Sequence, residues 1–216
     1  MKYEAERKAI VKACQDMNRR GINQGTSGNI SVRVKEGFLL TPSGMAYDEM
    51  KPGDIVLMRA DASHTGKRKP SSEWRFHHAL MTTRPEVGAV VHTHSMFATT
   101  LSCLGMEIPA VHYMVAAAGG HSIRCAPYAL FGTQTLSDHA LAALLNRRAC
   151  LLAHHGVIAL GTDLARAVWL AHEVEVLAKQ YLLACQLGAP PLLSEEQMDE
   201  VLEKFKTYGR RDKKDS

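Results

Sequence analysis

Histidines gather at two places in the sequence where buried strands are expected to end. His92 and His94 close one apolar segment, and side chains two residues apart on a strand leave the same face. A second apolar segment ends in His154 and His155, of which only one can join the cluster, because adjacent strand residues face opposite sides. Imidazole nitrogen binds zinc and related divalent ions, and a catalytic zinc commonly takes three protein ligands. The histidines predict such a site, with hydrogen-bonded histidines in the core as the alternative.

Three segments are rich in small hydroxyl residues and glycine, a composition suited to binding an anion such as phosphate. The first residues of a helix present free backbone N–H groups and a partial positive charge, and we expect a helix to open at Ser71. Loops that contain glycine offer further N–H groups to the same anion. Alternatively the segments are ordinary turns and caps, and Glu73 is a first-turn carboxylate. The residues concerned are Thr26, Gly28 and Asn29, then Ser43 and Gly44, then Ser71 and Ser72.

The stretch that carries these histidines contains no lysine, since none occurs between Lys69 and Lys179. A Schiff base with a carbonyl substrate needs a lysine amine. Schiff-base chemistry by a local lysine is therefore excluded, whereas polarisation of a carbonyl by a metal ion is not.

The charge of the chain is concentrated at its C-terminal end. The net charge is +4 over 216 residues. Residues 204–216 contain six basic and two acidic side chains, which sum to +4 and leave the rest of the chain balanced. We therefore expect no nucleic-acid partner, and we interpret 204–216 as a basic, mobile C-terminal tail.

Composition also indicates the compartment. No apolar run approaches the ~20 residues that span a bilayer, and the first residues carry acids and no long apolar block, unlike a secretory signal. The five cysteines are scattered without a C-x-x-C pair, which is typical of reduced thiols. The sequence predicts a cytoplasmic protein that does not bind membranes.

Apolar periodicity and turn residues predict a single α/β domain over residues 1–216. Apolar and polar residues alternate over 30–34, as in a strand, and a Glu36-Gly37 turn leads from there into the segment FLLT. This hairpin favours a mixed or antiparallel sheet. A capping box opens a last helix near Ser194, and residues 111–129 carry no clear signal. The other predicted elements are helices 4–19, 71–83, 135–146 and 163–187 and strands 54–59, 88–95 and 149–156.

Nine motifs in order along nearly the whole chain resemble a known family. They are NQGTSGNISVR, LTPSG, KPSSEWRFH, AVVHTHS, HYMVAAAGG, APYALFGT, LLAHHGVIA, WLAHEVEVLAKQY and VLEKFKTYG. The chain resembles the zinc-dependent class II aldolases of the adducin-like superfamily, and within it the branch that cleaves L-fuculose 1-phosphate. The resemblance implies a three-layer α/β/α fold with a central mixed, largely antiparallel sheet. It also implies a homotetramer with active sites at subunit interfaces.

The resemblance implies a metal centre and a proton carrier. One Zn²⁺ per subunit would be held by His92, His94 and His155, with Glu73 as a fourth ligand until substrate displaces it. Mn²⁺ or Co²⁺ would suit the same ligands. Glu73, once free, would move protons on the dihydroxyacetone phosphate half. Tyr113, reaching in from a neighbouring subunit, would handle the proton on the aldehyde oxygen.

The resemblance further implies which residues contact the two ends of the substrate. Phe131, Phe205 and Tyr208 would shape the aldehyde pocket, the last two from a mobile tail. The phosphate contacts would come from Thr26, Gly28, Asn29, Ser43, Gly44, Ser71 and Ser72.

The implied reaction is reversible cleavage of a ketose 1-phosphate, such as L-fuculose 1-phosphate, to dihydroxyacetone phosphate and an aldehyde such as L-lactaldehyde. The alternative is an aldolase for 5-deoxyribulose 1-phosphate or 5-methylthioribulose 1-phosphate in nucleoside salvage. A pentulose-5-phosphate 4-epimerase is disfavoured because that branch places aspartate where Glu73 stands. A methylthioribulose 1-phosphate dehydratase is disfavoured because residues 108–135 contain no acid. An adducin-like binding module is disfavoured because it lacks the histidine ligands.

Overall fold

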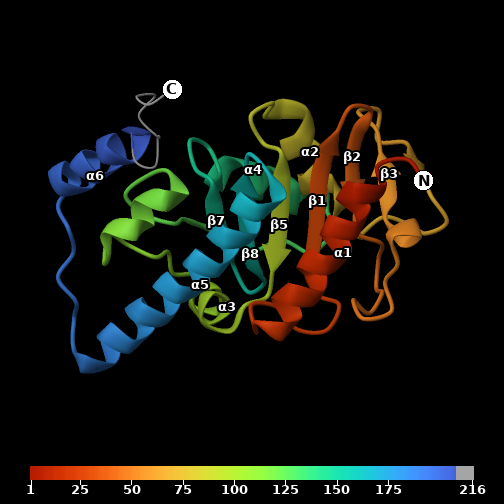
Figure 1. Ribbon diagram of the computed structural model, residues 1–216. Helices are drawn as coiled ribbons and strands as arrows, with labels where there is room; N and C mark the ends of the chain where they lie inside the picture. The colour runs from red at the N-terminus through yellow and green to blue at the C-terminus, as the bar shows by residue number, and fades with distance from the viewer. Residues whose placement is uncertain (208–216) are drawn as a thin grey trace, which may run out of the picture.

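A single mixed sheet forms the centre of the molecule (Figure 1), in a computed structural model that describes residues 1–207. All neighbouring strands in it are antiparallel except the last pair, β7 and β6. The predicted mixed, largely antiparallel sheet is therefore confirmed. The strand order across the sheet is β4 (His64–Thr65), β3 (Val56–Met58), β2 (Gly37–Leu40), β1 (Asn29–Val34), β5 (Ala89–Thr93), β8 (Gly156–Gly161), β7 (Ala149–Leu152) and β6 (Cys125–Ala126).

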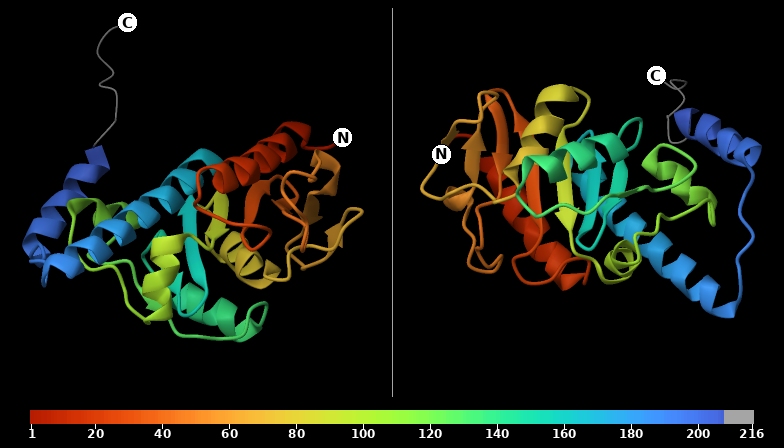
Figure 2. Two further views of the ribbon diagram at one scale, coloured as in Figure 1. Left: turned by 90° about the horizontal axis from the view of Figure 1, so that it is seen from below. Right: turned by 180° about the vertical axis from the view of Figure 1, so that it is seen from behind.

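Helices cover both faces of the sheet, which confirms the three-layer α/β/α architecture (Figures 1 and 2). Side chains alternate along the central strand, so that Val91 enters one hydrophobic core and Val90 enters the other. The first core packs under α1 (Glu4–Arg19), α3 (Met96–Cys103) and α5 (Leu164–Leu187), and the second under α2 (Trp74–Thr83) and α4 (Gln134–Ala143).

The helix predicted from Ser71 begins three residues later, at Trp74. The backbone N–H of Ser71 donates to the carbonyl of Thr41 at 3.0 Å, and Pro42 and Pro70 form an isolated antiparallel bridge. Ser71 is thus tied to the end of β2, and its carbonyl accepts the Trp74 N–H at 3.1 Å in the turn that precedes the helix. The same pairing places the Ser43-Gly44 loop beside the serines that precede α2.

The segment 149–156 is predicted as one strand, but it contains strand β7 and the turn that leads into strand β8. β7 ends at Leu152, and β8 begins at Gly156. His154 adopts a left-handed conformation (φ 56°), which lets the chain reverse within this short turn. The predicted strand 88–95 also ends early, at Thr93, so that His94 lies just beyond it.

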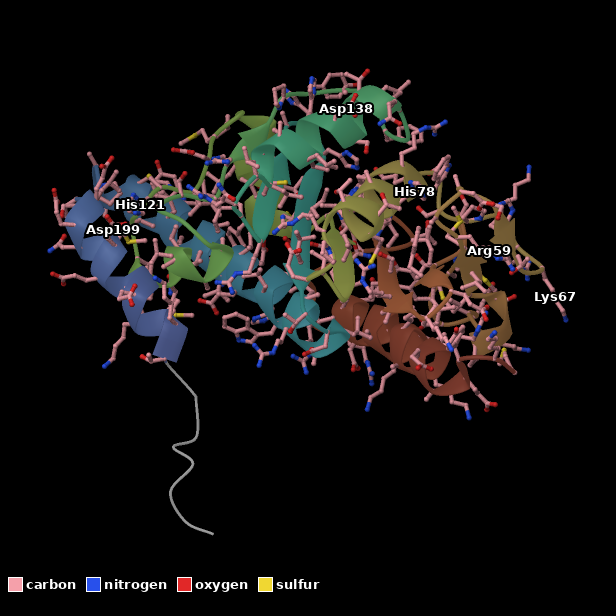
Figure 3. The ribbon with its side chains drawn as sticks, turned by 90° about the horizontal axis from the view of Figure 1, so that it is seen from above. Arg59, Lys67, His78, His121, Asp138 and Asp199 are labelled. Atoms are coloured by element: carbon pink, nitrogen blue, oxygen red, sulfur yellow. The ribbon has the colours of Figure 1, made fainter. Side chains whose placement is uncertain are left out.

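The C-terminal helix α6 (Glu195–Thr207) packs against the short 3₁₀ helix η2 (Tyr113–Ala118), which lies in the segment that gave no sequence signal. His121 and Asp199 point toward one another from these two regions (Figure 3), with Nε2 of His121 2.8 Å from Oδ1 of Asp199. The predicted capping box is present, because Ser194 and Gln197 exchange hydrogen bonds between side chain and backbone. Another 3₁₀ helix, η1 (Pro52–Asp54), precedes β3.

The predicted tail 204–216 is only partly described. Residues 204–207 form the last turn of α6, and residues 208–216 lie outside the described part of the chain. Within residues 1–207, no helix combines the length and the apolar composition that a bilayer crossing requires.

Candidate metal centre and substrate cavity

Three histidines converge at the end of β5, where β1 begins and the β7–β8 turn passes. The Nε2 atoms of His92 and His94 are 3.0 Å apart, and each pair of rings within the trio with His155 has its centroids 4.9 Å apart. One nitrogen from each ring lies within 4.8 Å of the others. The structure brings His155, and not His154, into this cluster.

Hydrogen bonds to the backbone set the orientation of the cluster. His92 is fully buried, and its Nδ1 lies 2.8 Å from the carbonyl oxygen of Val157 on β8, so that Nδ1–H donates and Nε2 faces the other rings. The backbone N–H of His94 donates to the Asn23 side chain at 3.2 Å. Glu175 on α5 accepts two hydrogen bonds, both of 2.9 Å, from the first turn of α3, immediately after His94. Both sides of the strand end are therefore anchored.

Glu73 supplies a carboxylate to the same centre. It immediately precedes α2 and is buried, with Oε2 3.1 Å from Nε2 of His92 and Oε1 3.2 Å from Nε2 of His155. Burial alone would raise the pKa of this carboxyl group, but the positive charge and close contact of His92 and His155 outweigh it and hold the pKa well below its usual range. Glu73 is therefore ionised.

The donor set fits a divalent metal ion. Oε1 of Glu73 is buried and accepts no well-aligned hydrogen bond, although Nε2 of His155 lies 3.2 Å away. A cation held between the carboxylate and the imidazole nitrogens would satisfy this oxygen. Burial and the charges of His92 and His155 lower the pKa of His94 to about 3, which keeps its ring free of a second proton. Three imidazole nitrogens and one carboxylate oxygen form a donor set typical of zinc.

The cluster opens into a cavity of about 380 Å³. Glu73, His94 and His155 form one wall of this cavity, which we call the metal cavity. A second wall is polar, and a third is largely aromatic. The polar residues are Thr26, Ser27, Ser43, Gly44 and Ser72, and the remaining lining residues are Tyr128, Ala129, Phe131 and His154.

Three of the predicted phosphate residues lie behind this cavity instead of lining it. The carbonyl of Gly28 accepts a hydrogen bond from the Tyr47 hydroxyl. Ser71 accepts one from the backbone N–H of Glu73 at 3.3 Å, and Nδ2 of Asn29 donates to Oε2 of Glu73 at 2.9 Å. Their direct contact with phosphate remains a prediction, whereas their contacts within the chain support the cavity wall.

The residues predicted to contact the aldehyde lie in two different cavities of the chain. Phe131 is exposed at the mouth of the metal cavity. Tyr113 and Phe205 lie together in another cavity, of about 680 Å³, with ring centroids 6.5 Å apart. No lining residue is common to the two cavities. Tyr208 falls outside the described residues.

Sequence reasoning missed several residues of this region. Tyr128 lies in the segment without a signal, and it lines the cavity with its ring centroid 6.0 Å from that of His154. His154, a candidate for the histidine cluster, lines the cavity instead. Asn23 could have been suspected, because it belongs to the same polar loop as Thr26. Glu175 on α5 is distant in sequence from His94 and left no local signal.

Comparisons with known proteins agree with this geometry. The sequence model of the family described as "Class II Aldolase and Adducin N-terminal domain" matches residues 8–182. The chain is 54% identical to a 5-methylthioribulose-1-phosphate/5-deoxyribulose-1-phosphate aldolase of Rhodospirillum rubrum, over 95% of this chain and 93% of that one. It is 53% identical to an L-fuculose phosphate aldolase of Escherichia coli K12, over 94% of each chain. A solved structure named L-fuculose 1-phosphate aldolase superposes with a TM-score of 0.90 at 40% identity, over 93% of this chain and 95% of that one.

Gly156 leaves no room for a side chain beside the histidines. A Cβ atom there would lie 2.4 Å from the Thr93 carbonyl oxygen and 3.0 Å from the His94 ring. We expect Gly156→Ala to displace His94 and to weaken zinc binding about tenfold or more, the scale seen when groups that orient metal ligands are lost. Competition with a chromogenic chelator measures this affinity. Gly53→Ala is the matched control, since nothing lies within 4 Å of its Cβ position; equal affinities in both variants would contradict the steric argument.

His77 makes the stability of the metal-free protein depend on pH. It is fully buried, and burial together with the charge of His92 lowers its pKa to about 3. Below its unfolded pKa of about 6.5 only the unfolded chain takes up this proton, so the free energy of unfolding falls with pH by about 1.4 kcal/mol per unit. We expect a correspondingly smaller loss, by about 2 kcal/mol between pH 6.5 and 5, in His77→Gln. Urea unfolding with chelator present measures it, with exposed His64→Gln as the control; parallel pH profiles for wild type and His77→Gln would refute it.

Proposed function

This chain belongs to the class II aldolase and adducin family and is an aldolase, and we propose that it cleaves ketose 1-phosphates between carbons 3 and 4. Breaking that bond leaves the three carbons that carry the phosphate as dihydroxyacetone phosphate and releases the remainder as an aldehyde. The observation that carries the proposal is the ionised Glu73 beside three converging histidines, at the wall of a cavity lined by hydroxyl groups.

The residues of the metal cavity divide the work of this reaction. A divalent ion bound by His92, His94 and His155, which we propose to be zinc, would supply polarisation of the substrate carbonyl and stabilisation of the negative charge left by bond cleavage. Glu73 would carry a proton to and from the dihydroxyacetone phosphate carbon, because its Oε1 faces the cluster without a hydrogen bond.

The polar part of the cavity suits the phosphate. Thr26, Ser43 and Ser72 bring hydroxyl groups to the same cavity wall, and Gly44 adds a backbone in the left-handed conformation (φ 64°) without a side chain. Hydroxyl and backbone N–H groups are the usual ligands of a phosphate that is bound without a large positive charge. Gly28, Asn29 and Ser71 would support this wall from behind.

The aromatic part of the cavity suits an aldehyde with an apolar end. Tyr128 and Phe131 line it together with Ala129. L-fuculose 1-phosphate, 5-deoxyribulose 1-phosphate and 5-methylthioribulose 1-phosphate all end in a methyl group. We propose L-fuculose 1-phosphate as the principal substrate. The two pentulose phosphates remain the second candidate, because a relative named for them is as similar as one named for fuculose phosphate.

A homotetramer with shared active sites completes the proposal. Tyr113 and Phe205 lie in a cavity that shares no lining residue with the metal cavity of the same chain. If all of these residues act on one substrate, Tyr113 and Phe205 must come from a neighbouring copy. Tyr113 is half exposed, so its hydroxyl is accessible for the proton on the aldehyde oxygen.

A panel of phosphorylated ketoses tests the reaction directly. We expect dihydroxyacetone phosphate to appear from the three ketose 1-phosphates that end in methyl groups and not from a pentulose 5-phosphate. A chelator, His92→Ala or His155→Ala should abolish both bound zinc and product, because a catalytic zinc has few ligands to lose. A coupled assay for dihydroxyacetone phosphate and elemental analysis give the two readouts, with His64→Ala as control. Full turnover by metal-free protein would refute the proposal.

Mixed tetramers test the shared site. Glu73→Gln and Tyr113→Phe each impair one part, so we expect subunits of the two variants, once exchanged, to regain activity in sites that combine an intact Glu73 with an intact Tyr113. Steady-state rates before and after subunit exchange measure this recovery. Glu73→Gln mixed with His155→Ala is the control and should not recover, since both residues line one cavity. No gain in the first mixture would place both residues in the same chain's site.

A further inference from the structure

Four buried side chains form an alternating hydrogen-bonded chain between β1 and α2. Asn29 and Ser31 are two residues apart and leave the same face of β1, while Glu73 and His77 are one helical turn apart at the start of α2. Ser31 Oγ lies 2.7 Å from Nδ1 of His77, and Nε2 of His77 lies 2.5 Å from Oδ1 of Asn29. Nδ2 of Asn29 lies 2.9 Å from Oε2 of Glu73. The chain therefore runs from Ser31 through His77 and Asn29 to Glu73.

The hydrogen bond that Nδ2 of Asn29 donates to Glu73 fixes the direction of the other bonds in this chain. A carboxylate only accepts hydrogen bonds, so Asn29 must turn its NH₂ group toward Glu73 and its oxygen toward His77. His77 must then donate from Nε2–H, which leaves Nδ1 unprotonated. Nδ1 accepts in turn from the hydroxyl of Ser31. The Asn29 amide is thus restricted to one of its two orientations, and the His77 ring is restricted to one of its two neutral tautomers.

Water does not compete with these bonds. Ser31 and His77 are fully buried, and Asn29 and Glu73 are about 95% buried. A buried donor or acceptor that loses its partner costs about 1–3 kcal/mol, so the single arrangement that satisfies all four groups is strongly favoured. His77 is fully buried, and this burial opposes its protonation.

We propose that His77 is a positioning residue for Glu73, acting through the side chain of Asn29. By accepting the Nε2–H of His77, Oδ1 of Asn29 is kept away from the carboxylate, and Nδ2 holds Oε2 in place. Oε1 is thereby left facing the histidine cluster without a hydrogen bond. Without the His77 donor, the Asn29 amide is free to turn its oxygen toward Glu73, which repels the carboxylate. This role rests on the proposed function only in that Glu73 carries the proton.

Two substitutions separate this role from simple packing. The Nε2 of glutamine reaches the place of the imidazole Nε2, so His77→Gln retains the donor to Asn29. Asparagine is shorter and reaches only the place of Nδ1, so His77→Asn retains the contact with Ser31 and loses the donor. We expect kcat to fall by about 10-fold to 100-fold in His77→Asn, with KM little changed, and to stay within about threefold of wild type in His77→Gln. Equal kcat values in the two variants, or a loss confined to KM, would overturn the proposal.

The tautomer of His77 provides a readout that requires no turnover. We expect ¹⁵N NMR of the full-length protein, with the His77 signals identified by their absence in His77→Gln, to show a protonated Nε2 and an unprotonated Nδ1. A protonated Nδ1 would require Asn29 to be reversed and would overturn the proposal even if His77→Asn folds poorly. If wild type cleaves no ketose 1-phosphate, the proposed function fails, yet the tautomer still decides whether His77 orients Asn29 as described.

Discussion

A carboxylate buried among imidazole rings is the interaction on which the rest of the site depends. Removing an ionised Glu73 from water is costly unless positive charge and hydrogen bonds replace its hydration. His92, His155 and Asn29 provide that replacement from the end of β5, the β7–β8 turn and the start of β1. The balance is local and incomplete, because Oε1 receives no hydrogen bond. An electropositive group held between this oxygen and the imidazole nitrogens would complete the balance.

The elements that bring these groups together were predictable where the signal is local. The hairpin 30–40 indicated an antiparallel sheet, and the Ser194 capping box located the last helix. The predicted start of α2 at Ser71 was wrong, because Ser71 pairs with Thr41 of a distant segment, and this pairing overrides a helix signal that is local in sequence. The turn at His154 was missed because a left-handed residue other than glycine is not expected in an apolar run.

The histidines of the cluster were easier to predict than the residues that hold the backbone around them in place. Histidine is rare and its spacing is conspicuous, so His92 and His94 could be named from the sequence, and the choice of His155 came from the family resemblance. Asn23 and Glu175, which anchor the backbone on either side of His94, are ordinary polar residues in sequence. Their roles depend on contacts between segments about 70 to 80 residues apart. Such contacts follow from the packing of the three layers and leave no periodic pattern to detect.

The proposed division of the cavity between the two ends of the substrate would account for relatives of nearly equal similarity that act on different sugars. Relatives with 54% and 53% identity carry names for different ketose phosphates. In the proposed reaction, the histidine cluster and the polar wall of the cavity would meet the half of the substrate that all these sugars share. The distal end of the sugar would meet the aromatic part of the cavity, where Tyr128 and Phe131 are exposed. Exposed residues tolerate substitution without loss of stability. On this proposal the buried residues determine the chemical step, and a few substitutions at the mouth of the cavity would be enough to alter which aldehyde is released.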